Sequence, residues 1–213
     1  MFKRMMQIAA AVVLAVPVLA AEWMTDLAAA KERAAAEGKL VLLEFTGSGW
    51  CYWCGRLHSD VLDTPEFESY ARDKFVLVQV DLPRPPDMTA PPADEKQRLC
   101  QEYRVYGYPN ILVLHPQGYV VGGFAGYRRG LDEARKPLDA AVGAARAIRL
   151  ALEGPLEQRV DLISMVYRDM ESNARSAAGM PCVVADAEDE QKLRAAVLQR
   201  FCAAPAAAEP ARD

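Results

Sequence analysis

The sequence predicts an α/β fold in which a four-stranded mixed sheet is flanked by helices. Four runs of strand length are rich in apolar and β-branched residues, and they lie at 40–45, 75–82, 111–114 and 119–124. Helical patterns separate the first two runs, so we expect those two strands to be parallel. A short Pro-Gln-Gly turn separates the last two runs, which should pair as an antiparallel hairpin.

The N-terminal residues have the pattern of a secretory signal. Lys3 and Arg4 precede an apolar run over residues 8–19, which ends in the sequence Val-Leu-Ala, followed by a second alanine. The run is shorter than the roughly 20 apolar residues that span a bilayer. We therefore predict a cleavable signal at 1–20, no stable membrane span after cleavage, and a periplasmic or secreted protein.

The overall composition suits one compact domain with an extension. Of the 213 residues, 52% are hydrophobic and 25% are charged, and the formal net charge is -4. A mildly acidic chain without a basic run offers no surface for phosphate backbones, so nucleic acid is excluded as a partner. Export would place the five cysteines where disulfides persist, which makes them candidates for redox chemistry or for structural bonds.

The first helix of the mature chain should precede the first strand. Its apolar residues recur at helical spacing, and they are Trp23, Leu27, Ala30 and Ala34. Thr25 is the candidate N-cap, and Gly38 supplies a stop. The strand over 40–45 is apolar except for Glu44, so it should be covered on both faces and lie centrally in the sheet.

Three further helices are predicted before the hairpin. The first covers 51–61, and the second covers 65–73 behind the capping residue Thr64. Five prolines mark a loop over 83–92, and a helix over 93–103 follows it. The two helices between the first and second strands provide the crossover that parallel strands require.

A long helix follows the hairpin and ends the main domain, which we assign to residues 21–154. Its predicted buried stripe consists of Leu138, Val142, Ala145 and Leu152. A Gly-Pro pair at 154–155 ends this helix. Residues 155–202 have the pattern of a helical appendage with a Gly-Met-Pro break, and residues 203–213 are expected to be a disordered tail.

Cys51 and Cys54 carry the clearest chemical signal in the chain. They follow the predicted central strand and begin a helix, and two intervening residues place the sulfurs within disulfide distance. At a helix N-terminus, unpaired backbone N–H groups and the helix dipole favour the thiolate of the first cysteine. We therefore predict Cys51 as the nucleophile and Cys54 as the buried thiol that resolves the mixed disulfide.

Three other interpretations of the cysteine pair can be compared with the sequence. A c-type haem site needs histidine directly after the second cysteine, and position 55 is glycine. A structural zinc site could use Cys51, Cys54 and His58, but no second cysteine pair at metal spacing completes the ligand set. A purely structural disulfide is the third, although a CxxC pair after a buried strand is typical of redox proteins. We expect no metal and no cofactor.

Two segments resemble the thioredoxin superfamily, in the right order and in the right predicted elements. The first, Glu44 to Cys54, reads Glu-Phe-Thr-Gly-Ser-Gly-Trp-Cys-Tyr-Trp-Cys and is similar to the active-site stretch of exported thioredoxin-like proteins. The second, Tyr103 to Asn110, is similar to the segment that carries the family's cis-proline before a strand. The resemblance covers residues 23–150 and implies a thioredoxin-like fold.

The resemblance also implies roles for individual residues. Pro109 would help to align the substrate chain beside the cysteine pair, with Tyr108 before it. Glu44 would take the proton of the resolving cysteine, and a solvated glutamate on an edge strand is the alternative. The aromatic side chains next to the cysteines are assigned to substrate binding, and they are Trp50, Tyr52 and Trp53.

The remaining thiols and histidines receive no catalytic role. Cys100 is expected to pack in the core. Cys182 and Cys202 flank the last predicted helix, and in an oxidising compartment they are expected to form a structural disulfide. His58 and His115 are single histidines, which are more often surface or packing residues.

We predict a thiol–disulfide oxidoreductase that acts on exported proteins through Cys51 and Cys54. Its partners would be exported protein thiols or disulfides and an unknown electron-exchange partner. Tyr52 and Trp53 bring no positive charge to the Cys51 thiolate, so a strongly oxidising potential is not expected. A peptide-binding or chaperone-like module without redox turnover is the alternative. The sequence leaves open whether the enzyme reduces, oxidises or isomerises disulfides.

Overall fold

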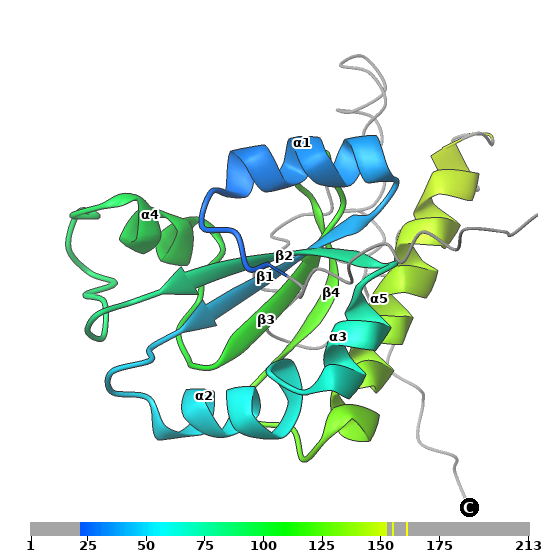
Figure 1. Cartoon of the computed structure of the whole chain (residues 1–213). Helices are drawn as coiled ribbons and strands as arrows, with labels where there is room; N and C mark the ends of the chain where they lie inside the picture. Colours follow the sequence, from blue (N-terminus) through cyan, green and yellow to red (C-terminus); the bar gives the residue numbers. More distant parts are fainter. Residues whose placement is uncertain (1–21, 153–154, 156–160, 162–213) are drawn as a thin grey trace, which may run out of the picture.

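A computed structural model of the chain describes residues 22–152, 155 and 161 (Figure 1). Its four strands are β1 (Leu40–Thr46), β2 (Phe75–Asp81), β3 (Asn110–Leu114) and β4 (Val120–Ala125). Its helices are α1 (Leu27–Glu37), α2 (Tyr52–Leu57), α3 (Pro65–Ala71), α4 (Glu95–Glu102) and α5 (Leu131–Leu152), with a π-helical turn, η1 (His58–Leu62). The predicted α/β class is confirmed.

The sheet has the order β2-β1-β3-β4, so β1 is a central strand as predicted. β1 pairs with β2 in parallel and with β3 in antiparallel orientation, and β3 and β4 form the predicted hairpin. In this register Glu44 lies opposite Gln79 of β2 and Ile111 of β3. A single carboxylate in the middle of the sheet is therefore flanked by one amide side chain and one aliphatic side chain.

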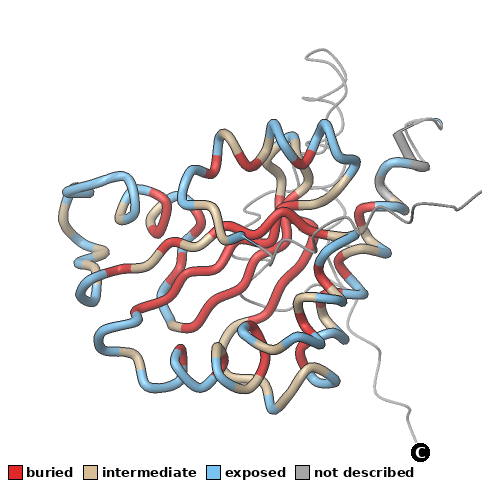
Figure 2. Tube along the Cα trace, in the orientation of Figure 1, coloured by how far each residue is buried: buried red, intermediate tan, exposed pale blue. Residues whose placement is uncertain are grey.

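Helices cover both faces of the sheet, which explains why its strands are almost uniformly apolar. Figure 1 shows α1 across one face and α2, α3 and α5 on the opposite face. Figure 2 shows the strands buried along nearly their whole length, whereas the helices alternate between buried and exposed residues. β1 runs toward the loop before α2, so the central strand delivers the chain directly to the cysteine pair.

The start of α1 differs from the prediction. The N-cap is Asp26 and not Thr25, and the Asp26 carboxylate accepts two backbone N–H hydrogen bonds of 2.8 and 3.0 Å. Trp23 precedes the helix, because Met24 forms an isolated parallel bridge with Val78 of β2. Apolar spacing could not separate a helical residue from an extended one that packs at the sheet edge.

The segment between β1 and β2 is less regular than one long helix followed by another. The predicted helix over 51–61 is divided into α2 and the π-helical turn η1, which widens the helix at His58. Thr64 caps α3 as predicted, since its hydroxyl accepts a 3.2 Å hydrogen bond from the N–H of Phe67. In α5, the predicted stripe residues Leu138 and Ala145 are buried, and Pro137 lies inside the helix.

Several predictions concern residues outside the described part of the chain. These are the signal at 1–20, the appendage at 155–202 apart from residues 155 and 161, the tail at 203–213 and the Cys182–Cys202 disulfide. They stay predictions. Within the described residues, no helix combines the length and apolar character that crossing a membrane requires.

Candidate active site

The loop between β1 and α2 is held in place by the end of β2. The backbone N–H and hydroxyl of Ser48 donate hydrogen bonds of 2.9 and 2.6 Å to the carboxylate of Asp81. The indole N–H of Trp50 donates a 2.9 Å hydrogen bond to the carbonyl of Leu82. Gly47 fits beside that indole because it has no side chain, and a Cβ at position 47 would overlap the ring of Trp50. These contacts orient the chain as it enters the cysteine pair.

Cys51 and Cys54 form a disulfide at the start of α2, with an S–S distance of 2.13 Å and Cα atoms 5.3 Å apart. Cys51 is the N-cap of α2, and its Sγ accepts a 3.2 Å hydrogen bond from the backbone N–H of Cys54. Cys54 is fully buried, whereas Cys51 is partly exposed. Only the first sulfur is therefore open to a substrate, and a backbone donor is in place to stabilise its thiolate after reduction.

The loop before β3 lies beside the cysteine loop. The peptide bond between Tyr108 and Pro109 is cis. The Tyr108 ring packs edge-on against Trp50, with ring centroids 5.4 Å apart. The Tyr108 hydroxyl donates a 3.6 Å hydrogen bond to Sγ of Cys100, which is buried in the core as predicted. Trp50 and Tyr108 thus bring the two segments of the family resemblance together.

Aromatic side chains lie in the CxxC segment and in contact with it, and five of them form what we call the aromatic rim. They are Trp50, Tyr52, Trp53, Tyr108 and Tyr127. Tyr52 and Trp53 are 70% and 54% exposed, which is unusual for large aromatic residues. Trp53 contacts the rings of both Tyr52 and Tyr127, at centroid distances of 5.2 and 5.4 Å. The rim therefore consists of two groups of contacting rings, Trp50 with Tyr108, and Trp53 with Tyr52 and Tyr127.

Tyr127 is a rim residue that the sequence analysis missed. It lies in the loop between β4 and α5, and its hydroxyl donates a 2.6 Å hydrogen bond to the carboxylate of Asp60. The same Asp60 oxygen forms an ion pair of 2.6 Å with Arg56. The hydrogen bond from Tyr127, with smaller contributions from its other partners, lowers the pKa of Asp60. No local pattern near position 127 could have placed this residue beside the CxxC helix, because the contact spans 67 positions in the sequence.

Glu44 is completely buried in β1, which excludes the solvated edge-strand alternative. Gln79 donates a 3.1 Å hydrogen bond from its side-chain amide to Oε2 of Glu44. His58 Nε2 lies 2.9 Å from Oε1 and 3.1 Å from Oε2 of the same carboxylate. A buried carboxylate is tolerated here because both of its oxygens have partners.

His58 is a second residue that the sequence analysis did not place at the site, because it was interpreted as a surface or packing residue. Burial alone would lower the pKa of His58, but its hydrogen bond and attraction to Glu44 outweigh this effect. Together with Asp63, they raise that pKa from 6.5 to about 9. One feature of the sequence could have indicated this location: His58 lies four residues after Cys54. That spacing puts both residues on one face of the predicted helix.

The raised pKa of His58 predicts a dependence of stability on alkaline pH. Folded His58 keeps its proton between pH 6.5 and about 9, where the unfolded chain has released it. The contribution is therefore complete below pH 6.5 and is lost as the pH rises through about 9. His58 is partly exposed, so solvent screening reduces the effect. As the pH rises from 6.5 to above about 9, we expect the free energy of unfolding of the oxidised protein to fall by about 1 to 2 kcal/mol.

Urea denaturation at pH values on either side of this window measures that loss. The variant His58→Gln should lack it, and His115→Gln should retain it, because these are the two histidines of the chain. A loss of equal size in the His58→Gln variant would show that another group causes the dependence.

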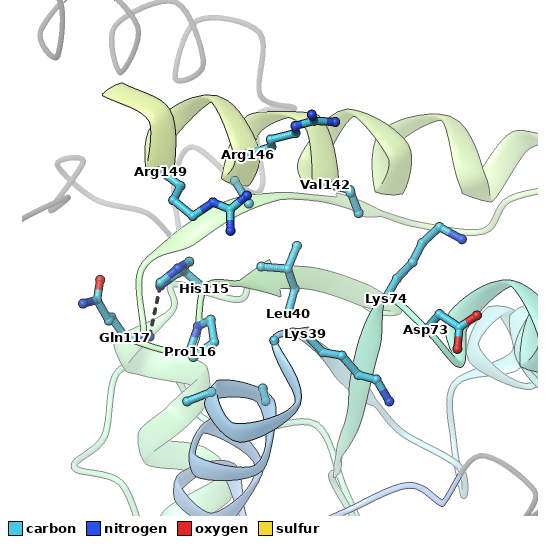
Figure 3. Close-up of a pocket in the computed structure, with 14 residues that line it drawn as sticks. Lys39, Leu40, Asp73, Lys74, His115, Pro116, Gln117, Val142, Arg146 and Arg149 are labelled. Atoms are coloured by element: carbon cyan, nitrogen blue, oxygen red, sulfur yellow. Dashed lines mark hydrogen bonds between the residues drawn. The ribbon is translucent and has the colours of Figure 1, made fainter. Parts of the chain in front are cut away.

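A cleft of about 620 Å³ lies at the opposite end of the sheet, near the start of β1 (Figure 3). Its lining includes His115, Arg146 and Arg149. Burial, together with the charge of Arg149, lowers the pKa of His115. All of the lining residues lie outside the cysteine loop, the aromatic rim and the surroundings of Glu44. The cleft is therefore separate from the cysteine site.

The fold and the cysteine pair together define a thiol–disulfide oxidoreductase of the thioredoxin type. Residues 22–116 match the family described as thioredoxin-like. The disulfide bond reductase DsbH of Chlamydia pneumoniae is 30% identical over an alignment of 129 residues, and the alignment covers 56% of this chain and 77% of that protein. The chain belongs to the thioredoxin-like family.

One solved structure gives the same result for the fold. A DsbH oxidoreductase superposes with a TM-score of 0.51 at 24% identity, covering 67% of this chain and 95% of that one. A thioredoxin from Thermus thermophilus has a TM-score of 0.46 at 26% identity, covering 59% and 93% of the two chains. The first of these likenesses supports the thioredoxin-like architecture described above.

Proposed function

We propose that this chain is an exported disulfide reductase that passes electrons from a partner dithiol to the disulfides of exported proteins. The observation that carries the proposal is the asymmetry of the pair, with Cys51 partly exposed and Cys54 fully buried behind it. That arrangement allows one sulfur to attack a substrate while the other is kept for resolution. The relative from C. pneumoniae is named a disulfide bond reductase, which favours reduction over oxidation and isomerisation.

The reaction transfers two electrons in two displacements. The Cys51 thiolate attacks one sulfur of the substrate disulfide, forms a mixed disulfide and releases the first substrate thiolate. Cys54 then gives its proton to Glu44 and attacks the Cys51 sulfur, which releases the second substrate thiolate. The substrate is reduced, and the Cys51–Cys54 disulfide is formed. A partner dithiol of unknown identity restores the reduced pair.

The surface around Cys51 suits a polypeptide with apolar side chains. The aromatic rim offers several exposed rings beside the disulfide, and aromatic rings bury large areas at a low cost in side-chain entropy. Pro109 and Tyr108 lie on the other side of Trp50, where the backbone of this loop would align an extended segment. We therefore assign substrate binding to the rim and to the cis-proline loop.

Export is supported by the N-terminal pattern. Lys3 and Arg4, followed by the apolar run over 8–19, have the order of charges and apolar residues that a secretory signal needs. The substrates in this proposal are therefore periplasmic or secreted proteins that carry disulfides.

The equilibrium potential of the Cys51–Cys54 pair tests the proposal. We expect a value near the roughly -270 mV of thioredoxin and far from the roughly -120 mV of a strong periplasmic oxidant, because no cation adjoins Cys51 in the motif. The mature chain, residues 21–213, would be equilibrated in thiol–disulfide buffers and assayed for stoichiometric reduction of insulin.

Two results would argue against a reductase. A potential in the range of the strong oxidant would reverse the proposed direction of exchange. A potential below about -300 mV, without electron transfer to a protein disulfide, would favour the peptide-binding alternative.

A further inference from the structure

His58 joins the buried carboxylate to the protein surface. On its inner side, Nε2 lies within 3.1 Å of both oxygens of Glu44. On its outer side, Nδ1 lies 3.0 Å from Oδ1 of Asp63, whose side chain is 61% exposed. The imidazole itself is largely buried. One histidine therefore contacts the carboxylate of the core strand and a carboxylate in solvent.

The surroundings of His58 favour a positively charged ring. Both ring nitrogens face carboxylate oxygens, and both can donate only when the imidazole is protonated. The groups that face it are Glu44 from β1, Asp63 after η1, the neutral amide of Gln79 from β2, and the ring of Trp23 at a centroid distance of 6.1 Å. The two charged groups, Glu44 and Asp63, are both acidic, and both therefore stabilise the protonated form of His58.

The same helix face carries the resolving cysteine. His58 follows Cys54 by one turn, and its backbone N–H donates to the Cys54 carbonyl. Residues four apart lie one above the other along a helix. Cys54 is fully buried, and one turn after it His58 reaches Glu44 of β1.

We propose that His58 is a positioning residue that keeps the Glu44 carboxylate ionised and oriented to accept the Cys54 proton near neutral pH. A buried carboxyl without a cation takes up a proton more readily, because burial disfavours the charged form. A protonated Glu44 cannot act as the base. The inference rests on the proposed exchange reaction and adds a residue that sets the pH range of its second step.

The test is a stopped-flow measurement on the reduced mature chain with an aromatic disulfide whose two halves are coloured thiolates. The first thiolate reports attack by Cys51, and the second reports resolution by Cys54. In the His58→Gln variant, we expect the second phase to slow by about tenfold at neutral pH and its pH midpoint to rise by about one unit. The first phase should be unchanged, which also shows that the variant is folded.

Two further variants separate charge from structure. His115→Gln should behave as the wild type, because His115 stacks on Tyr119 and lies at the opposite end of the sheet. Gln79→Lys, added to His58→Gln, places a cation from β2 at the position opposite Glu44, where the native amide is already 3.1 Å from the carboxylate. We expect this second change to restore the rate and the midpoint.

Each result bears on the proposal. An unmoved second phase in His58→Gln, or equal slowing of both phases, would overturn it. Failure of Gln79→Lys to restore the second phase would overturn the role of charge. A wild-type chain that shows both phases with the aromatic disulfide but does not reduce insulin would refute the proposed protein reductase and leave the role of His58 standing.

Discussion

Replacing Cys51 with serine is expected to abolish thiol–disulfide exchange, down to the uncatalysed background. Cys54 cannot take over the attack, because its side chain is completely buried in the disulfide form. Cys51 alone combines exposure with a backbone donor, the N–H of Cys54, 3.2 Å from its sulfur. The insulin-reduction rate of the purified variant measures this loss, and His115→Gln is the control because His115 lies in the cleft at the opposite end of the sheet.

Replacing Cys54 with serine is expected to have a different effect, although turnover is lost in both variants. Attack by Cys51 still occurs, but no thiol is available to release the substrate, so mixed disulfides accumulate. Non-reducing electrophoresis and mass spectrometry of protein from the cell envelope would detect covalent adducts at Cys51. Adducts on the Cys51→Ser variant and none on Cys54→Ser would reverse the two roles.

The second large effect is expected for Glu44→Gln, which should slow resolution about 100-fold at neutral pH and leave the initial attack unchanged. Glutamine has nearly the same shape and can still bond to its neighbours, but it cannot accept a proton from Cys54. Glu44 suits that role because it is completely buried and both of its oxygens are held by His58 and Gln79. The base proposed for resolution is thus a group of the buried strand that is shielded from solvent.

The two-phase stopped-flow assay separates these steps for Glu44→Gln as well. The first phase is the internal control for folding and for access to Cys51. If both phases keep their wild-type rates across the pH range, Glu44 takes no part in proton transfer. The carboxylate would then be a structural partner of His58.

The parts of the site that are contiguous in sequence could be predicted. Cys51 and Cys54 are three residues apart, and their position between a strand and a helix follows from local apolar patterns. The buried strand around Glu44 was also recognisable, because a nearly unbroken apolar run of strand length belongs to the centre of a covered sheet. Capping by Thr64 was predictable for the same reason, since the cap bond spans only three residues.

Predictions failed where packing over long distances decided the structure. Trp23 has the spacing of the residues on α1, but the bridge of its neighbour Met24 to β2 takes it out of the helix, and its ring lies near His58. The π-helical turn at His58 interrupts the 3.6-residue period that sequence patterns assume. The local spacing of apolar residues does not show which residues of another helix or strand a side chain will contact.

By itself, the sequence determined the α/β class, the order of the strands along the chain and the identity of the redox pair, because each depends on residues a few positions apart. The tertiary structure alone decided which side chains surround that pair. His58 reaches Glu44 across 14 positions, Gln79 reaches it across 35, and Tyr127 reaches Asp60 across 67. Such contacts arise only when the parallel crossover and the β4–α5 loop pack against the sheet. The surroundings of Glu44 and the aromatic rim therefore depend on the topology of the chain.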